Sequence, residues 1–173
     1  QSGYFVGQLD YDKGQFSHGD FHELDLGFEF YAPQTTLTDD NRRLLIGWMG
    51  IPDGDEFYQP TVEHGWIHTM TCPRELTLEA GKIIQRPARE LCQLRGEVQL
   101  WQGIAQEAPV WDITHAEVEI VTDRSFHVDI GGELELAWDG EWLRLSRNNR
   151  RSGKPEQRVW HGALCHLTLM CDS

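Results

Sequence analysis

The segment Phe28–Arg86 decides the fold; it begins FEFYAPQTTLTDDNRRLLIGWMG and ends TCPRELTLEAGKIIQR. Its first part, Phe28–Leu37, is rich in aromatic and β-branched residues, and Arg43–Met49 is a largely apolar run, so both are typical of strands. Ile67–Leu78, which a proline interrupts, and Lys82–Arg86 have the same character and follow turn residues. We therefore predict four short antiparallel strands joined in sequence, which is the pattern of one blade of a β-propeller.

Short strands are also predicted on both sides of this segment. Tyr4–Leu9 and Gln15–Ser17 flank a turn, and Pro87–Gln99 has a mixed pattern that we interpret as a joint between two units. Six further alternating runs follow: Val118–Val121, Phe126–Ile130, Leu134–Trp138, Trp142–Leu145, Gln157–Trp160 and Cys165–Met170. Asp139-Gly140, between two of these runs, predicts a two-residue hairpin. Strands at this spacing favour an antiparallel β-sandwich, and no segment has a helical period longer than two turns.

The composition argues against two classes of partner. With 15 basic and 28 acidic residues among 173, the formal net charge is −13. A nucleic-acid partner requires a basic stripe, and an anionic membrane would repel this charge, so we expect neither partner. The four cysteines form no C-x-x-C pair or disulfide framework, and no apolar run approaches the length of a membrane span. Reduced thiols and acidic charge favour a soluble protein of the cytoplasm.

Several motifs resemble one family when they are taken in order. These are YFVGQLDYDKGQF at 4–16, ELDLGFEFYAPQ at 23–34, RRLLIGWMG at 42–50 and TCPRELTLEAGKIIQRP at 71–87. Together they resemble the β-fructofuranosidases, the invertases and sucrose or sucrose-6-phosphate hydrolases of glycoside hydrolase family 32. The resemblance implies the last blade, and part of the preceding one, of a five-bladed β-propeller over residues 1–88. Residues 89–173 would then form an incomplete C-terminal β-sandwich.

The resemblance also implies a reaction whose catalytic groups this sequence does not carry. Retaining hydrolysis of a fructosyl bond needs a carboxylate nucleophile and a second carboxylic acid about 5 Å away. The family supplies these groups from W-M-N-D-P-N-G and E-C motifs, and an R-D-P motif binds fructose hydroxyls; none of the three occurs here. We therefore expect the chain to be a fragment, cut at both ends relative to a larger glycosidase, and inactive by itself.

Three residues are candidates for contact with the sugar. The resemblance places Asp25 and Tyr31 near the mouth of the propeller funnel and Trp48 in the wall against which the substrate packs. An aromatic ring suits the apolar face of a sugar. The structural alternatives are that Asp25 orders the turn at Gly27 and that the two aromatic residues belong to the core. The motif that contains Arg74 looks structural: an arginine held by neighbouring carboxylates would lock the blade to the sandwich.

Metals and organic cofactors are not expected. His64-x-x-x-His68 has the spacing of a ligand pair but lacks the H-E-x-x-H context of a zinc site. The expected partner is sucrose or a related fructoside. Two other functions stay open, a non-catalytic sugar-binding module and a structural domain that mediates oligomer contacts. A blade without its neighbours would expose the faces of Phe28, Phe30, Leu45 and Ile46, so we also expect self-association.

Overall fold

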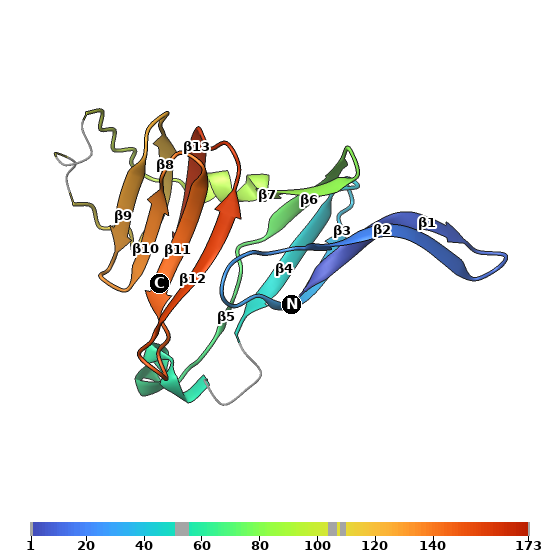
Figure 1. The fold of residues 1–173 in the computed structure, drawn as a ribbon, viewed down its shortest axis with the longest axis horizontal. Coiled ribbons are helices and arrows are strands. Elements are labelled where there is room, and N and C mark those ends of the chain that lie inside the picture. The colour runs from blue at the N-terminus through green and yellow to red at the C-terminus, as the bar shows by residue number, and fades with distance from the viewer. Residues whose placement is uncertain (1, 51–55, 104–106, 108–109, 173) are drawn as a thin grey trace. The chain divides into compact units, whose positions relative to one another are not determined.

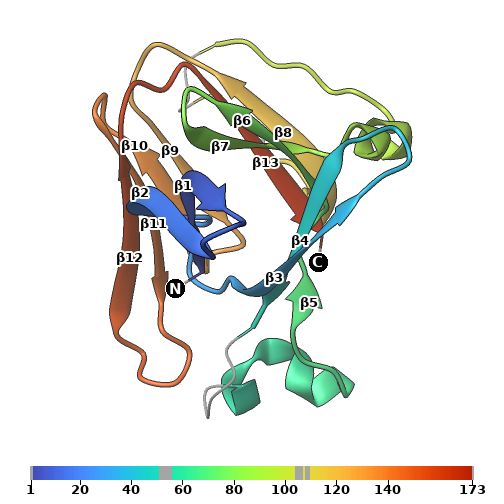
Figure 2. The same ribbon diagram turned by 90° about the vertical axis from the view of Figure 1, so that its right-hand side faces the viewer.

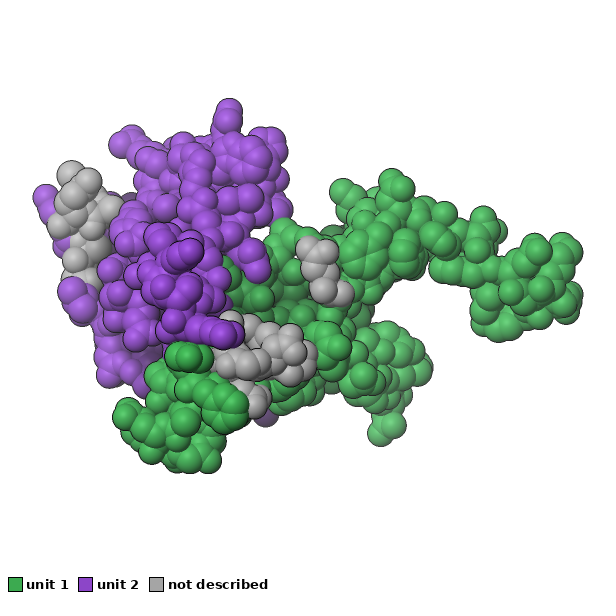
Figure 3. Space-filling view, turned by 60° about the horizontal axis from the view of Figure 1, so that its bottom comes forward, with its two compact units in different colours: residues 1–89 green, residues 90–173 purple. Residues whose placement is uncertain are grey.

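The computed structural model describes residues 2–50, 56–103, 107 and 110–172. They divide into two compact units, residues 1–89 and residues 90–173, coloured separately in Figure 3, and each unit is described by itself. Both are built almost entirely from antiparallel strands, as the sequence predicts. In the part of the chain that the structure covers, no helix has the length and apolar character needed to cross a membrane.

Unit 1 begins with an isolated two-stranded hairpin. Strand β1 (Gly3–Asp10) pairs with β2 (Gln15–Glu23) from Gly3 opposite Glu23 to Asp10 opposite Gln15. The carboxylate of Asp10 accepts hydrogen bonds from the backbone N–H groups of Asp12 and Lys13, which fixes the turn predicted there. Figure 1 shows the hairpin as a long ribbon that projects from the rest of the unit.

The predicted meander forms the main sheet of unit 1. Its strands are β3 (Tyr31–Leu37), β4 (Arg43–Met49), β5 (Thr69–Met70), β6 (Arg74–Glu79) and β7 (Lys82–Pro87). The order is β3-β4-β6-β7, all neighbours are antiparallel, and β5 also pairs with β4. The hydroxyl of Thr71 accepts a hydrogen bond from the Gly47 backbone, and the Thr71 N–H donates to the Gly47 carbonyl. Both β5 and β6 pair with β4, and Thr71 lies in the gap between them. Its two bonds to Gly47 therefore continue the link to β4 across this gap.

Two expectations for this sheet are corrected. The first strand starts at Tyr31 rather than Phe28, and its pairing is irregular: Ala32 has a φ of 43°, and a register shift lies between Tyr31 and Gln34. Leu45 is not exposed: only 1% of its surface is accessible, because it lies on the central strand β4. Ile46, its neighbour on the opposite face, is 37% exposed, as expected for a blade face without a neighbour.

The polar loop between β4 and β5 contains two short 3₁₀-helices, η1 (Glu56–Tyr58) and η2 (Pro60–His64). They lie beyond the end of the sheet near β5 in Figures 1 and 2. Pro60 occupies the start of η2, where its missing N–H costs nothing, and Gly65 ends the helix at a φ of 82°. Pro52 and Gly54, which the sequence also assigned to this loop, lie outside the described residues.

Unit 2 consists of the 3₁₀-helix η3 (Arg89–Leu94), which crosses the boundary, and two antiparallel sheets. One sheet has the order β12-β11-β10-β9, and the other pairs β13 with β8. The strands are β8 (His115–Val121), β9 (Phe126–Ile130), β10 (Leu134–Trp138), β11 (Trp142–Asn148), β12 (Pro155–His161) and β13 (His166–Asp172). Leu136 and Trp138, two residues apart on one face of β10, are each 4% exposed and mark the core.

The hairpin predicted at Asp139-Gly140 joins β10 to β11, but three residues separate the strands instead of two. The Asp139 carboxylate accepts hydrogen bonds from the N–H groups of Glu141 at 2.9 Å and Trp142 at 2.8 Å. These bonds and the Arg144 guanidinium lower the Asp139 pKa to about 2. The turn is therefore stabilised by a charged carboxylate.

Candidate functional site

An aromatic cluster forms where β3 begins and β4 ends. Tyr31 lies opposite Trp48 in the ladder, and their rings meet edge to face with centroids 6.1 Å apart. Trp48 also contacts His68, with ring centroids 4.6 Å apart and an interplanar angle of 82°. Tyr31 is 46% exposed whereas Trp48 is half-buried. The cluster therefore presents an accessible phenol ring next to the Trp48 indole, and the indole in turn packs against the His68 imidazole.

The backbone around the cluster is strained. Ala32 has a φ of 43° and His68 a φ of 65°, conformations that residues with a side chain seldom adopt. Gly50 is buried against the cluster: a Cβ placed there would lie 2.5 Å from the Trp48 ring and 2.7 Å from the His68 ring. Such strained conformations persist only where contacts with the surrounding structure enforce them, and they are concentrated at functional sites.

His68 serves this cluster by packing. Its Nε2 atom is buried and has no hydrogen-bond partner within the described segments. His64, four residues earlier, is exposed and lies 3.6 Å from Glu63. No group of three or more His, Cys, Asp or Glu side chains in the described part of the chain could hold a metal ion. The sequence analysis considered these two positions only as a metal-ligand pair, did not favour that interpretation, and missed the packing of His68 against Trp48.

Asp25 is already occupied on both carboxylate oxygens. Oδ1 accepts a hydrogen bond from the Gly27 N–H at 2.7 Å, and Oδ2 lies 2.8 Å from Nη1 of Arg74. The same nitrogen donates to Gln85 Oε1 at 3.0 Å, and the guanidinium carbon lies 5.1 Å from the centroid of the Phe30 ring. Asp25 thus orders the turn at Gly27, as the structural alternative held, and anchors residues 24–30 to strands β6 and β7.

The partner of Arg74 corrects one further expectation. We expected carboxylates around this arginine to lock the blade to the sandwich, but Asp25 belongs to unit 1, as Arg74 does. The pair spans 49 positions in the sequence, and both side chains are largely withdrawn from solvent, at 28% exposure for Arg74 and 17% for Asp25. Its role is to hold the segment that leads into β3, and therefore to position Tyr31.

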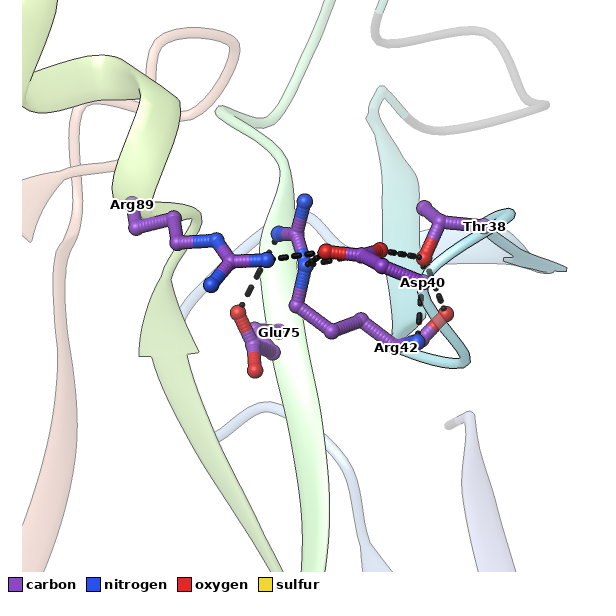
Figure 4. Close-up of polar contacts among 5 residues, drawn as sticks. All are labelled: Thr38, Asp40, Arg42, Glu75 and Arg89. Atoms are coloured by element: carbon purple, nitrogen blue, oxygen red, sulfur yellow. Dashed lines mark hydrogen bonds and ion pairs between the residues drawn. The ribbon is translucent and has the colours of Figure 1, made fainter.

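A second polar network lies at the turn that joins β3 to β4, at the opposite end of these strands from the aromatic cluster. Asp40 accepts hydrogen bonds from the Thr38 hydroxyl at 2.6 Å and from Arg42 Nε at 2.9 Å, and it also pairs with Arg89 (Figure 4). Arg42 reaches Glu75 on β6 at 3.3 Å. The Thr38 hydroxyl and the Arg42 and Arg89 charges lower the Asp40 pKa below its ordinary value. The network therefore requires an ionised carboxylate.

The fold has close structural counterparts among glycoside hydrolases. The sucrose-6-phosphate hydrolase of Lactobacillus gasseri superposes with a TM-score of 0.65 and 16% identity, over 96% of this chain and 37% of that one. A Bombyx mori β-fructofuranosidase of glycoside hydrolase family 32, solved in complex with sucrose, superposes with a TM-score of 0.57 and 21% identity, over 99% of this chain and 42% of that one. At these identities the comparison shows the fold alone: all-β, with the propeller and sandwich architecture expected from the sequence.

The sequence comparison is more specific. The model of the glycosyl hydrolases family 32 N-terminal domain matches residues 1–87, and the chain belongs to this family. The sucrose-6-phosphate hydrolase of Klebsiella pneumoniae is 47% identical over 169 residues, and that of Salmonella typhimurium is 46% identical over 169 residues. These alignments cover 98% of this chain but 36% of each relative. The chain thus spans about a third of the length of the curated relatives that it matches.

Proposed function

We propose that this chain supplies the late-propeller and sandwich part of a retaining β-fructofuranosidase that acts on sucrose or sucrose 6-phosphate. The observation that carries the proposal is the alignment of nearly the whole chain with two sucrose-6-phosphate hydrolases at 46–47% identity. The nucleophile and the acid/base would come from sequence outside this chain, because none of the three catalytic motifs occurs in it. By itself the chain would not hydrolyse the substrate.

The propeller part would comprise residues 1–88 and the sandwich part residues 89–173. Two observations support this division: the compact units divide after Arg89, and the family model ends at residue 87. The cytoplasm is the proposed location. Its support is that Cys72, Cys92, Cys165 and Cys171 are all free thiols, which a reducing compartment maintains.

Within this chain, Tyr31 and Trp48 are the residues proposed to contact the sugar. The exposed Tyr31 ring offers a flat apolar surface with a hydroxyl at its edge, a combination that fits a sugar ring with its equatorial hydroxyls. The strained backbone at Ala32 and His68 on either side of the pair supports a functional role. Direct contact by Asp25 stays a prediction; its bonds to Gly27 and Arg74 support a positioning role instead.

A chimera tests the proposal. Residues 1–173 would replace the aligned region of the Klebsiella pneumoniae sucrose-6-phosphate hydrolase, which restores the two thirds of the relative that this chain does not match. We expect the chimera to hydrolyse sucrose 6-phosphate, with Tyr31→Ala raising KM more than it lowers kcat. The matched control is Tyr11→Ala, because Tyr11 is 87% exposed at the hairpin turn and should leave both constants unchanged. A folded chimera without glycosidase activity would refute the proposal.

The aromatic pair also favours a second candidate, a sugar-binding module without catalysis. Titration of the isolated chain with fructose or sucrose, followed by tryptophan fluorescence, separates the two functions. Saturable binding at millimolar concentration or below that Trp48→Phe weakens, together with an inactive chimera, would favour the module. Binding of the sugar only by the active chimera would favour the glycosidase.

A further inference from the structure

Unit 2 has a sheet face that the proposed reaction does not use. Leu136 and Trp138 of β10 are buried in the core, and they lie opposite Leu145 and Leu143 of β11, which share their face. Because side chains alternate along a strand, the residues that alternate with these leucines lie on the opposite, outer face of the sheet. Six residues of β11 and β12, called the outer row below, form three cross-strand pairs there: Trp142 with His161, Arg144 with Val159, and Ser146 with Gln157.

Trp142 forms the aromatic end of the outer row. It is 38% exposed, and its ring contacts the His161 ring with centroids 4.6 Å apart and an interplanar angle of 50°. The Trp142 backbone N–H donates to the Asp139 carboxylate at 2.8 Å, which fixes the backbone that carries the ring. An indole is flat and apolar with a polar N–H at its edge, and it therefore suits the C–H face of a sugar ring.

Hydrogen-bonding groups continue the outer row beyond the indole. Arg144 follows Trp142 on the same face at about 7 Å along the strand. Its side chain is 35% exposed, and Nη1 donates to Asp139 Oδ2 at 2.5 Å, a bond that orients the guanidinium but uses only part of its N–H donors. In the next pair, Gln157 donates to the Ser146 hydroxyl at 2.9 Å. The row thus leads from an aromatic surface to oriented polar groups, which matches sugar units with apolar faces and hydroxyl edges.

The charges around the outer row favour a neutral ligand. Among its six residues the one fixed charge is that of Arg144, and the Asp139 carboxylate pairs with it. The whole chain has a formal net charge of −13, which repels anions. A phosphorylated sugar or another polyanion would therefore meet a cation that is already paired on an acidic protein, whereas a neutral oligosaccharide needs only the ring surface and the hydrogen-bonding groups.

We infer that the outer row is a non-catalytic binding site for a neutral oligosaccharide, in which one sugar unit stacks on Trp142 and Arg144 donates hydrogen bonds to the hydroxyls of a neighbouring unit. The inference goes beyond the proposed function, because the outer row lies in unit 2 and contains neither Tyr31 nor Trp48. Its ligand differs as well, since the site takes an oligosaccharide without a phosphate group.

Isothermal titration calorimetry of the 173-residue chain tests the inference, with the neutral tetrasaccharides nystose and maltotetraose as probes. We expect saturable binding of at least one probe at millimolar concentration or below. Trp142→Ala should weaken this binding by about tenfold or more, and Trp142→Phe, which keeps a smaller ring, should weaken it less. Arg144→Met should weaken it by about threefold or more. The matched control is Trp111→Ala, because Trp111 is 40% exposed in the same unit but lies outside its strands, and it should leave the affinity unchanged.

Three results would overturn the inference. The first is that neither probe binds saturably, and the second is that Trp142→Ala and Trp142→Phe both bind as tightly as wild type. The third is binding that Tyr31→Ala abolishes and Trp142→Ala leaves intact, because the sugar would then lie on unit 1. The isolated chain is used throughout, so the outcome does not depend on whether the chimera hydrolyses sucrose 6-phosphate, and a failure of the proposed function is distinguishable from a failure of this site.

Discussion

The anchor between Arg74 and Asp25 yields a prediction that can be worked from the geometry. Arg74→Met keeps the length of the side chain but removes two hydrogen bonds, at 2.8 Å to Asp25 and 3.0 Å to Gln85, and the cation–π contact with Phe30. A hydrogen bond to a charged group contributes about 1.5–3 kcal/mol, and a cation–π contact about 0.5–1 kcal/mol. Since Arg74 is 28% exposed, solvent reduces these values, and we expect a loss of about 2 kcal/mol in the free energy of unfolding.

The assay is urea unfolding of the full chain, followed by tryptophan fluorescence, with Arg86→Met as the matched control. Arg86 pairs with Glu79, but the two side chains are 57% and 52% exposed, so loss of this pair should change the free energy of unfolding little. The two variants change the same residue type on neighbouring strands. If Arg74→Met is no more destabilising than Arg86→Met, the role assigned to the anchor is wrong.

Three further predictions follow from single residues. Leu45→Ala should lower the free energy of unfolding by about 2–5 kcal/mol, whereas Leu37→Ala, at a position 54% exposed, should cost less than about 1 kcal/mol in the same urea experiment; equal losses would contradict the assignment of the core. Asp139→Ala should be less stable than wild type at neutral pH, with the difference closing as pH falls from 3.8 to about 2, because the folded-state pKa is depressed and the stabilisation needs the ionised form. A difference that does not change between these pH values, measured by thermal melting, would contradict the assignment. Gly50→Ala should shift the tryptophan emission spectrum and destabilise unit 1 by about 1–3 kcal/mol, because the added methyl group would collide with two rings; an unchanged spectrum and melting curve would show that the cluster is loosely packed.

The strands were predictable because local pattern and turn chemistry agree along most of the chain. Arg43–Met49 and Leu134–Trp138 have the predicted bounds, since apolar runs that end at Asn, Asp or Gly leave little freedom in where a strand stops. The turn before Arg43 was predictable for the same reason: Asn41 has a φ of 62°, and asparagine is a turn residue that tolerates this left-handed conformation. Pro73 likewise lies between β5 and β6, where the sequence places an interruption.

The candidate site was less predictable because its geometry depends on contacts distant in sequence. The irregular first turn of β3 was not predictable, because Ala32 adopts a positive φ and alanine carries no signal for that conformation. The pairing of Asp25 with Arg74 joins positions 49 residues apart, and no local pattern selects that partner. His68 has a ligand-like spacing from His64, but its packing against Trp48 depends on the close approach that Gly50 allows. The sequence signal that could have indicated close packing around Trp48 was Gly50, a residue without a side chain two positions later.

Hydrolysis of sucrose 6-phosphate by the isolated 173-residue chain is the most direct test of the central claim, that this polypeptide provides scaffold and sugar contacts but not the reacting carboxylates. The purified chain and the chimera with the Klebsiella relative would be assayed side by side at equal concentration. We predict no glucose 6-phosphate release above background from the chain, and clear turnover from the chimera. Turnover by the isolated chain that Asp25→Asn abolishes would contradict the claim and make Asp25 a catalytic group.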